Sequence, residues 1–471
     1  MKTLKRPSDH TPKPVKILQF GEGNFLRAFA DWAIYEMNQN GYNAGVAVVQ
    51  PIDRGLAHML SAQDGLYHHL VRGLQKGKSV NNTILNDTIE QVINPFEDEA
   101  AYFAQAANKD LKIVISNTTE AGIQFQADDA QPSSGLAKTF PGKLTQLLHK
   151  RFETFGGSPE SGLVLIPCEL IEKNGEKLRE TLLQYAESWN LGADYADWIK
   201  NHNHFANTLV DRIVPGYPKD EIDDIKSRIG YDDQLVVASE VFHLWVIEGN
   251  EHVQEAFPAH QHGLNVKYVA DLTPYRTQKV RILNGAHTAM VPVGLLAGIE
   301  TVRENVEDEV IGDFILKIMY EEVAPTIDLP QEDVKQFADE VLERFKNPFV
   351  RHELKSISLN SISKYRVRIL PTVLDYIQLK QSLPQGFLFA LASLIKLYLS
   401  DNFEANDDAS VLEFFGNLKN TTDNKALAKA VLSNEDFWHQ DLTAIEGFEA
   451  QVGEYLEAID NHTIKDLVTK L

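Results

Sequence analysis

Short apolar runs alternate with longer amphipathic runs through the first half of the chain. Val15–Phe20 opens this pattern and leads into a turn with two glycines, and three further apolar runs continue it at Val46–Val49, Ile113–Ser116 and Leu163–Ile166. Alternating strands and helices are typical of a parallel sheet with helices on both faces, because parallel strands need a crossover connection that is usually a helix. The pattern therefore predicts an α/β fold whose N-terminal domain is Rossmann-like and doubly wound.

The pattern of apolar residues changes after about residue 270, where strand-like runs become scarce. Runs with helical spacing follow at Val310–Glu322, Gln331–Phe345, Gly386–Ser400 and Ala426–Leu432. Apolar residues that recur every three to four positions indicate amphipathic helices. We therefore predict a mainly α-helical C-terminal domain, with the boundary near Asp271–Pro274 and domains of residues 1–270 and 271–471.

The net charge and the cysteine count make some binding partners and cellular compartments less plausible for this protein. Acidic residues outnumber basic ones by 67 to 45, for a formal net charge of −22, and no basic block occurs. A nucleic-acid partner is therefore not expected, and an anionic substrate would need a local cluster of positive side chains.

Cys168 is the only cysteine, which excludes an intramolecular disulfide and favours a reducing compartment. With no run of about 18 apolar residues and no apolar signal segment in residues 1–14, we expect a cytoplasmic protein without a membrane partner.

The turn after the first predicted strand has features of a dinucleotide site. Two glycines, Gly21 and Gly23, would let the backbone approach a diphosphate, and the N-terminus of the next helix would favour its negative charge. Leu26 replaces the third glycine of the G-x-G-x-x-G pattern. The turn by itself therefore fits a plain strand–turn–helix equally well.

The loop after the second predicted strand also favours a dinucleotide-binding site. Asp53 follows this strand at the position where a carboxylate can bind the adenosine ribose hydroxyls. Its charge would repel a 2′-phosphate, which favours NAD over NADP, whereas the adjacent Arg54 opposes that preference. The residues expected to contact NAD are Phe20, Gly21, Gly23, Asn24, Phe25 and Asp53.

Three polar residues stand together in the apolar stretch KVRILNGAHTAMVP. At about 100° per residue, Lys279, Asn284 and His287 fall at roughly 0°, 140° and 80° around an α-helix, so one face can carry all three. A lysine partly shielded from water gives up its proton more readily, which suits general acid–base catalysis. An amide N–H can stabilise an alkoxide, and a histidine can orient a hydroxyl. From the spacing alone, the favoured interpretation is a structural helix whose lysine reaches solvent, with an amide cap and a hydrogen-bonded histidine.

These features occur with others in a series that resembles the mannitol dehydrogenase family of long-chain polyol and sugar-acid dehydrogenases. The series spans residues 19 to 371 in the family's order. Its members are QFGEGNFLRAFADW, QDGLYHHLVRG, SNTTEAGI, IPCELIEKNG, TLVDRIVPGYP, KVRILNGAHTA, RFKNPFVRHELKSISLN and KYRVRILP. The resemblance implies an NAD-dependent, zinc-independent dehydrogenase with no metal at its active site.

The resemblance also implies roles for single residues. Lys279 would be the catalytic acid/base, Asn284 would bind the reacting oxygen and His287 would position substrate hydroxyls. Asp211, one helical turn after Asn207, would be an acidic residue of the substrate site. Without the resemblance, Asp211 and its neighbour Arg212 would be interpreted as an ordinary surface ion pair.

The chain departs from mannitol dehydrogenases next to its cysteine. Those enzymes have Cys-Asp-Asn where this chain has Cys168-Glu169-Leu170. Leu170 cannot replace that asparagine as a partner of the reacting oxygen, and Asn174 is the nearby candidate. The departure agrees with a substrate that is not a simple polyol.

A sugar acid would bring a carboxylate to the site, and the run Lys364-Tyr365-Arg366-Val367-Arg368 can supply its counter-charge. Lys364, which matches a basic substrate-contacting position of the family, is the first choice. The subgroup most like this chain acts on a keto-uronate, so we expect reduction of D-tagaturonate to D-altronate. Fructuronate or a polyol such as mannitol are alternatives within the family. A nucleotide-binding protein without catalysis is the alternative from another class.

Overall fold

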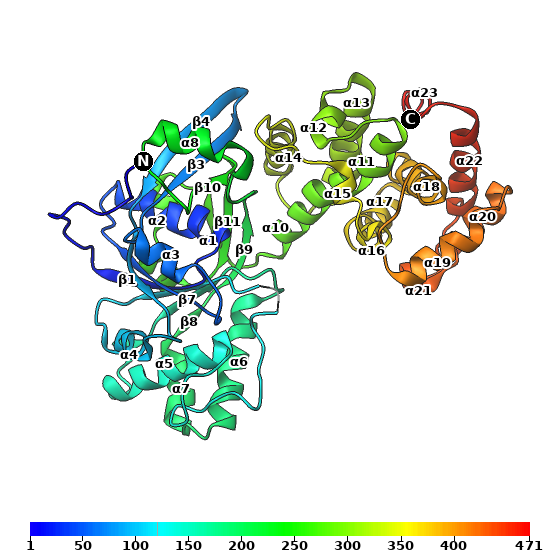
Figure 1. Cartoon of the computed structure of the whole chain (residues 1–471). Coiled ribbons are helices and arrows are strands. Elements are labelled where there is room, and N and C mark those ends of the chain that lie inside the picture. The colour runs from blue at the N-terminus through cyan, green and yellow to red at the C-terminus, as the bar shows by residue number, and fades with distance from the viewer. Residues whose placement is uncertain (120) are drawn as a thin grey trace. The chain divides into compact units, whose positions relative to one another are not determined.

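The computed structural model describes residues 1–119 and 121–471. Within them, contacts divide the chain into two compact units (Figure 1). The first, which we call the Rossmann unit, comprises residues 1–73 and 79–272. The second, which we call the helical unit, comprises residues 74–78 and 273–471.

A six-stranded parallel sheet forms the centre of the Rossmann unit. Its strands lie in the order β5-β2-β1-β6-β7-β8, and every neighbouring pair is parallel. Counted along the chain, this is the order 3-2-1-4-5-6 of dinucleotide-binding folds. The predicted α/β class and Rossmann-like domain are therefore confirmed. The strands are β1 (Val15–Phe20), β2 (Gly45–Val49), β5 (Ile89–Ile93), β6 (Ile113–Ser116), β7 (Val164–Pro167) and β8 (His204–Phe205).

Helices cover both faces of this sheet (Figure 1). One face packs against α4 (Glu99–Ala104), α5 (Phe140–Thr154), α6 (Asn174–Ser188) and α7 (Ala193–His202). The other face packs against α1 (Asn24–Ala28) and α2 (Ala30–Asn38). Successive strand residues point to opposite faces, and both sets are apolar because both faces are covered. Further helices of the unit are α3 (Ala57–Ala62), α8 (Ile222–Ile229) and α9 (Glu251–Ala256).

Two three-stranded sheets complete the Rossmann unit, in the orders β10-β3-β4 and β12-β11-β9. Their strands are β3 (Tyr67–Gln75), β4 (Lys78–Asn86), β9 (Asn207–Asp211), β10 (Val237–Ser239), β11 (Leu244–Glu248) and β12 (Val266–Val269). Asn207 and Asp211 therefore lie on a strand, and the helical turn expected between them was wrong. Four strand residues span about 13 Å, so these two side chains are too far apart to act on one atom.

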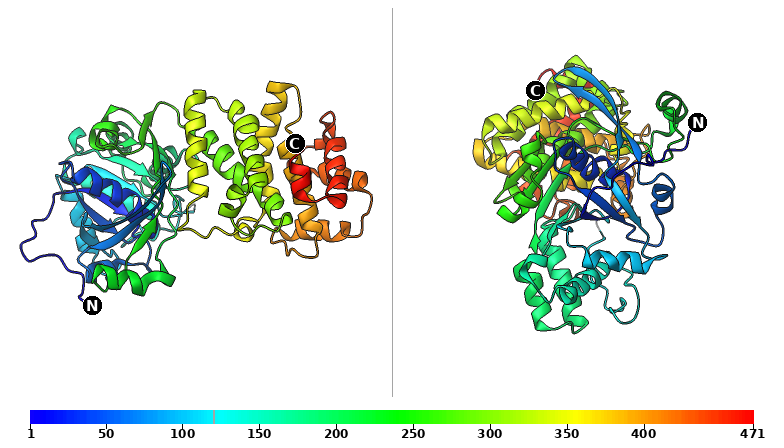
Figure 2. Two further views of the ribbon diagram at one scale, coloured as in Figure 1. Left: turned by 90° about the horizontal axis from the view of Figure 1, so that it is seen from above. Right: turned by 90° about the vertical axis from the view of Figure 1, so that its left-hand side faces the viewer.

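The helical unit contains helices joined by short loops (Figures 1 and 2). They are α10 (Thr273–Gln278), α11 (Gly285–Leu296), α12 (Val302–Glu307), α13 (Glu309–Lys317), α14 (Gln331–Phe345), α15 (Leu354–Ile357), α16 (Ser361–Arg368), α17 (Leu370–Lys380), α18 (Gln385–Leu399), α19 (Ala409–Leu418), α20 (Asn424–Leu432), α21 (Glu435–Trp438), α22 (Phe448–Asn461) and α23 (Ile464–Val468). The predicted helical character is confirmed. In the part of the chain that the structure describes, no helix is both long and apolar enough to cross a membrane.

Helix α18 lies at the centre of the helical unit and packs against α11 and α22. Twelve of its fifteen residues are buried, as expected for a predominantly apolar helix at the centre of a domain. Its N-terminus is capped by Glu322, which comes from the π-helical segment η6 (Ile318–Val323). The N–H of Gly386 donates to Glu322 Oε1 at 2.7 Å, and the N–H of Phe387 donates to Oε2 at 3.0 Å.

The burial of Glu322 predicts a pH dependence of stability. Glu322 is only 3% exposed, and burial raises the pKa of its carboxyl group from 4.5 to about 7. A raised pKa means that its stabilisation is complete below pH 4.5 and is lost as the pH rises through 7. The loss amounts to at most about 3 kcal/mol at 1.36 kcal/mol per pKa unit. Glu322→Gln, which stays neutral, should gain stability relative to the wild type between pH 5 and 8.

Urea unfolding of both proteins at several pH values measures this difference. Burial also raises the pKa of Asp31 to about 7, but Asp31 is present in both proteins, so its contribution cancels from the difference. A stability difference that is constant across this pH range would show that Glu322 does not titrate there.

Candidate functional site

The turn after β1 has room for a negatively charged group against its backbone. Gly21 has φ +120°, and a Cβ at this position would lie 2.9 Å from the carbonyl oxygen of Asn117. Only glycine fits there without strain. A Cβ on Gly23 would meet nothing within 4 Å. Gly21 therefore lets the turn pass close to Asn117, and Gly23 leaves an open backbone surface beside the start of α1, as a diphosphate requires.

The residues that follow the turn are held by a buried arginine. Arg27 donates from Nη2 to Asn24 Oδ1 at 2.8 Å and from Nε to the carbonyl of Glu22 at 3.1 Å. The helical segment after the turn is interrupted at Phe29, where the backbone leaves helical geometry and separates α1 from α2. The Phe25 ring stacks on Phe29, with ring centroids 5.0 Å apart.

The predicted cofactor residues occupy different surroundings. Phe20 is buried in β1 and packs on Phe140, with ring centroids 4.8 Å apart. Asp53 lies in the loop after β2, and its side chain is 77% exposed. Arg54 Nε is 3.9 Å from its carboxylate, a contact that contributes little at the surface. The carboxylate of Asp53 is therefore open to a ligand.

The segment from Lys279 to Asn284 is a π-helix, η5, inserted between α10 and α11. The N–H of Gly285 bonds to the carbonyl of Val280, five residues earlier. The expectation of a regular α-helix here was wrong. Single π-turns within α-helices are rare and are often found at functional sites.

The π-turn changes how the three candidate residues are arranged. In an α-helix, Lys279 and Asn284 would be separated by roughly 140°. A π-turn links residues i and i+5, so residues five apart lie more nearly above one another. Asn284 and His287 are three residues apart on the α-helical side and are neighbours on its surface. The helix thus aligns all three side chains more closely than the sequence spacing indicated.

Arg281, in the middle of η5, fixes the π-turn to other parts of the helical unit. Its Nη1 donates to the carbonyl and the hydroxyl of Thr326, at 3.1 and 3.0 Å. Its Nη2 lies 2.6 Å from a carboxylate oxygen of Asp375 in α17. Charge-assisted bonds of this kind are strong and directional, so they resist relaxation of the π-turn to an α-helix.

His287 lies in an aromatic environment formed by residues distant from it in sequence. Its ring centroid is 4.5 Å from that of Phe345 and 5.0 Å from that of His352. Burial lowers the pKa of His352, which favours a neutral imidazole able to donate and accept hydrogen bonds. His352 belongs to the quoted run RFKNPFVRHELKSISLN, yet nothing in its spacing pairs it with His287.

The predicted basic run is divided between different sides of α16. Lys364 and Arg368 are four residues apart and share a side, whereas Arg366 is turned about 200° from Lys364. Lys364 Nζ donates to the carbonyl of Ile357 at 2.7 Å, and burial together with nearby Arg368 lowers its pKa. Helix α16 packs against both η5 and α11.

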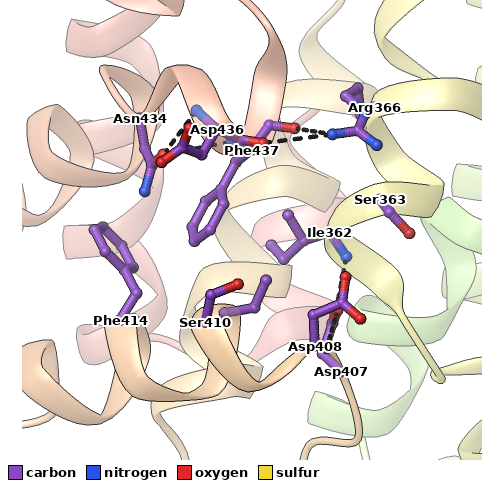
Figure 3. Close-up of a pocket in the computed structure, with 11 residues that line it drawn as sticks. Ile362, Ser363, Arg366, Asp407, Asp408, Ser410, Phe414, Asn434, Asp436 and Phe437 are labelled. Atoms are coloured by element: carbon purple, nitrogen blue, oxygen red, sulfur yellow. Dashed lines mark hydrogen bonds between the residues drawn. The ribbon is translucent and has the colours of Figure 1, made fainter.

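Arg366 lines a separate pocket of about 300 Å³ within the helical unit (Figure 3). Its Nη1 donates to the carbonyl of Phe437 at 3.1 Å. The pocket is also lined by Asp407, Asp408 and Asp436, which would repel a carboxylate. Arg366 is therefore a poor candidate for binding a sugar acid.

Asn174 and Asp211, the predicted substrate residues of the Rossmann unit, are both buried. Asn174 is 1% exposed, and its amide nitrogen donates to the carbonyls of Pro167 and Glu169 at 3.0 and 3.1 Å. Its oxygen accepts from the N–H of Thr208 at 2.8 Å. These bonds favour a structural role, and contact with a substrate stays a prediction. Leu170, in contrast, is 63% exposed.

Asp211 ends β9, opposite Leu244 of β11. Both Asp211 and Arg212 are buried, so the alternative of an ordinary surface ion pair was wrong. Arg212 donates from Nη1 to the carbonyl of Ala28 at 2.8 Å and lies over the ring of Trp32.

Residues 1–119 and 121–471 contain no group of three or more histidine, cysteine, aspartate or glutamate side chains placed to hold a metal ion. Each unit has its own group of candidate residues: the nucleotide turn in the Rossmann unit, and the polar stripe on η5 and α11 in the helical unit.

Comparison with known families accounts for both units. Residues 15–259 match the mannitol dehydrogenase Rossmann domain, and residues 271–460 match the mannitol dehydrogenase C-terminal domain. The chain belongs to the mannitol dehydrogenase family. Its relatives include altronate oxidoreductases of Phocaeicola vulgatus, 45% identical over 99% of both chains, and of Bacillus subtilis, 46% identical over 97% of this chain and 95% of the relative.

Solved structures show the same fold. A D-sorbitol dehydrogenase in substrate-free form has a TM-score of 0.82 at 20% identity, covering 99% of this chain and 97% of that one. The Pseudomonas fluorescens mannitol 2-dehydrogenase in a ternary complex with NAD and D-mannitol has a TM-score of 0.66 at 22% identity, covering 97% and 94%. At these identities the likeness concerns the fold.

Proposed function

We propose that this chain is an NAD-dependent oxidoreductase that reduces D-tagaturonate to D-altronate and catalyses the reverse reaction. The observation that carries the proposal is the alignment of Lys279, Asn284 and His287 by the π-turn η5. Relatives named altronate oxidoreductase, 42–46% identical over nearly the whole chain, support the choice of substrate. We place the reaction in the cytoplasm, with a small sugar acid as the ligand.

NADH, when bound at the glycine turn, would supply the hydride for the keto carbon. The residues of this chain then manage the oxygen and its proton. Lys279 donates a proton to the developing alkoxide, and the amide N–H of Asn284 stabilises the negative charge before that transfer. His287 orients a neighbouring hydroxyl. We propose that the lysine and the amide make a metal unnecessary.

Lys364 is the proposed partner of the substrate carboxylate. Its lowered pKa reflects a partly dry position, where an ion pair is stronger than in bulk water. Asp211 and Asn174 stay predictions as substrate contacts, and the bonds of Asn174 within the fold make it the weaker of the two.

A substrate panel tests the proposal directly. NADH consumption should be fastest with tagaturonate and much slower with fructuronate and fructose, and it should persist after dialysis against EDTA. Preferred reduction of fructuronate or fructose would replace the substrate assignment. An inactive protein that still binds NADH would support the alternative of a non-catalytic nucleotide-binding protein.

The exposed carboxylate of Asp53 predicts the preference between cofactors. Asp53→Ser should weaken NADH binding about ten-fold, because hydrogen bonds to a charged group are worth about 1.5–3 kcal/mol and exposure reduces that value. NADPH binding should strengthen, because the charge that repels its 2′-phosphate is removed. Fluorescence titration with each cofactor measures both changes. A wild-type protein that binds both cofactors equally would remove Asp53 from the ribose site.

A further inference from the structure

The proposed NAD contacts lie on two loops of the Rossmann unit. The glycine turn, Gly21–Asn24, follows β1, and the ribose loop, residues 50–56, follows β2. Because β1 and β2 are neighbouring parallel strands, the two loops begin side by side at the same edge of the sheet. The middle of the ribose loop is exposed around Asp53.

Glu22 connects the two loops. It stands between the two glycines of the turn and is 6% exposed. Its Oε1 accepts a hydrogen bond from the N–H of Leu56, at the end of the ribose loop, at 3.0 Å.

The ribose loop is shaped to receive this side chain. A Cβ on Gly55 would lie 1.9 Å from Glu22 Oε1, so any larger residue would displace the carboxylate. Gln50 organises the loop from within, since its Nε2 donates to the carbonyl of Ile52 at 2.9 Å and its Oε1 accepts from the N–H of Ala57 at 3.3 Å. These contacts hold both ends of the loop and leave Asp53 projecting from its middle.

We propose that Glu22 is a positioning residue for cofactor choice: its carboxylate ties the ribose loop to the glycine turn and so holds Asp53 where the adenosine ribose hydroxyls bind. This inference rests on the proposed use of NAD and of Asp53. A carboxyl group is costly to bury, and burial indeed raises the pKa of Glu22. An apolar side chain would fill this space at lower cost, but it could not accept the N–H of Leu56.

Equilibrium binding of NADH and NADPH separates positioning from general support of the fold. Glu22→Ala should weaken NADH binding about ten-fold, as Asp53→Ser does, and should leave NADPH binding unchanged or stronger. Glu22→Gln keeps an acceptor oxygen and should retain most of the NADH affinity. In the Asp53→Ser background, Glu22→Ala should have little further effect, because a residue that acts through Asp53 is silent without it.

A second variant covers the case in which Glu22→Ala does not fold. Gly55→Ala leaves Glu22 intact but forces its carboxylate away from Leu56, and its Cβ would also lie 2.7 Å from Oε1 of Gln50. Because it disturbs both contacts that shape the ribose loop, it should give the same selective loss of NADH affinity. Equal losses for NADH and NADPH, or additive effects in the double variant, would overturn the positioning role. If Asp53→Ser itself leaves NADH binding unchanged, the proposed ribose site fails and the inference fails with it. That outcome is distinct from a normal response to Asp53→Ser combined with no response to Glu22→Ala.

Discussion

Replacing Lys279 by alanine is expected to lower kcat for tagaturonate reduction by about 10²–10⁴-fold, the usual contribution of a positioned acid or base. The variant lacks the proton donor on the π-turn, so the alkoxide has to take its proton from water. NADH affinity should change little, because the glycine turn and the ribose loop belong to the Rossmann unit. Stopped-flow measurement of NADH oxidation, with a separate NADH titration, gives both quantities.

Two controls accompany this variant. Lys335→Ala removes an exposed lysine from α14 and should leave turnover within the variation of the wild type. Small primary amines added to Lys279→Ala should restore part of the rate, since they supply the missing acid. Near-normal turnover of Lys279→Ala would show that another group donates the proton.

Replacing Lys364 by methionine is expected to weaken tagaturonate reduction, measured as kcat/KM, by about ten- to a hundred-fold. The basis is a charge-assisted contact with the substrate carboxylate worth about 1.5–3 kcal/mol, at about 1.4 kcal/mol for each factor of ten. Reduction of fructose, which has no carboxylate, should change much less. Parallel assays with the two substrates measure the difference.

Lys364 also donates to the carbonyl of Ile357, so a structural effect needs its own control. Loss of that bond would affect both substrates equally, and equal losses would weaken the sugar-acid assignment. Arg366→Met is the matched variant, because it removes a cation of the same run from another side of α16. It should preserve the preference for tagaturonate over fructose.

The elements that were predicted residue for residue are those whose own composition decides their structure. Val15–Phe20 and Ile113–Ser116 form β1 and β6 as expected, because buried parallel strands are short apolar runs. Gln331–Phe345 forms α14 within the same bounds, because one of its faces is consistently apolar. The run at Asn207–Asp211 was taken for a helix because five residues are too few to show a period, and its pairing with β11 decides that it is a strand.

In the candidate site, too, the sequence identified the residues but not the geometry that brings them together. The sequence identified Lys279, Asn284 and His287 because they are polar side chains within an apolar run, where a polar side chain usually has a structural or functional role. The π-turn that aligns them was not predictable, because nothing in the spacing of KVRILN distinguishes five-residue from four-residue hydrogen bonding. The turn is held by Thr326 and Asp375, which are distant in sequence.

By itself, then, the sequence determined the alternation of strands and helices, the glycine turn and the identity of the polar residues. Each of these depends on local composition or backbone freedom. Only the tertiary structure decided which of those residues meet. It placed His352 beside His287, surrounded Arg366 with aspartates in a separate pocket, and joined Glu22 to the ribose loop. Such contacts arise where separate segments pack together, and the free energy of that packing, rather than local propensity, selects them.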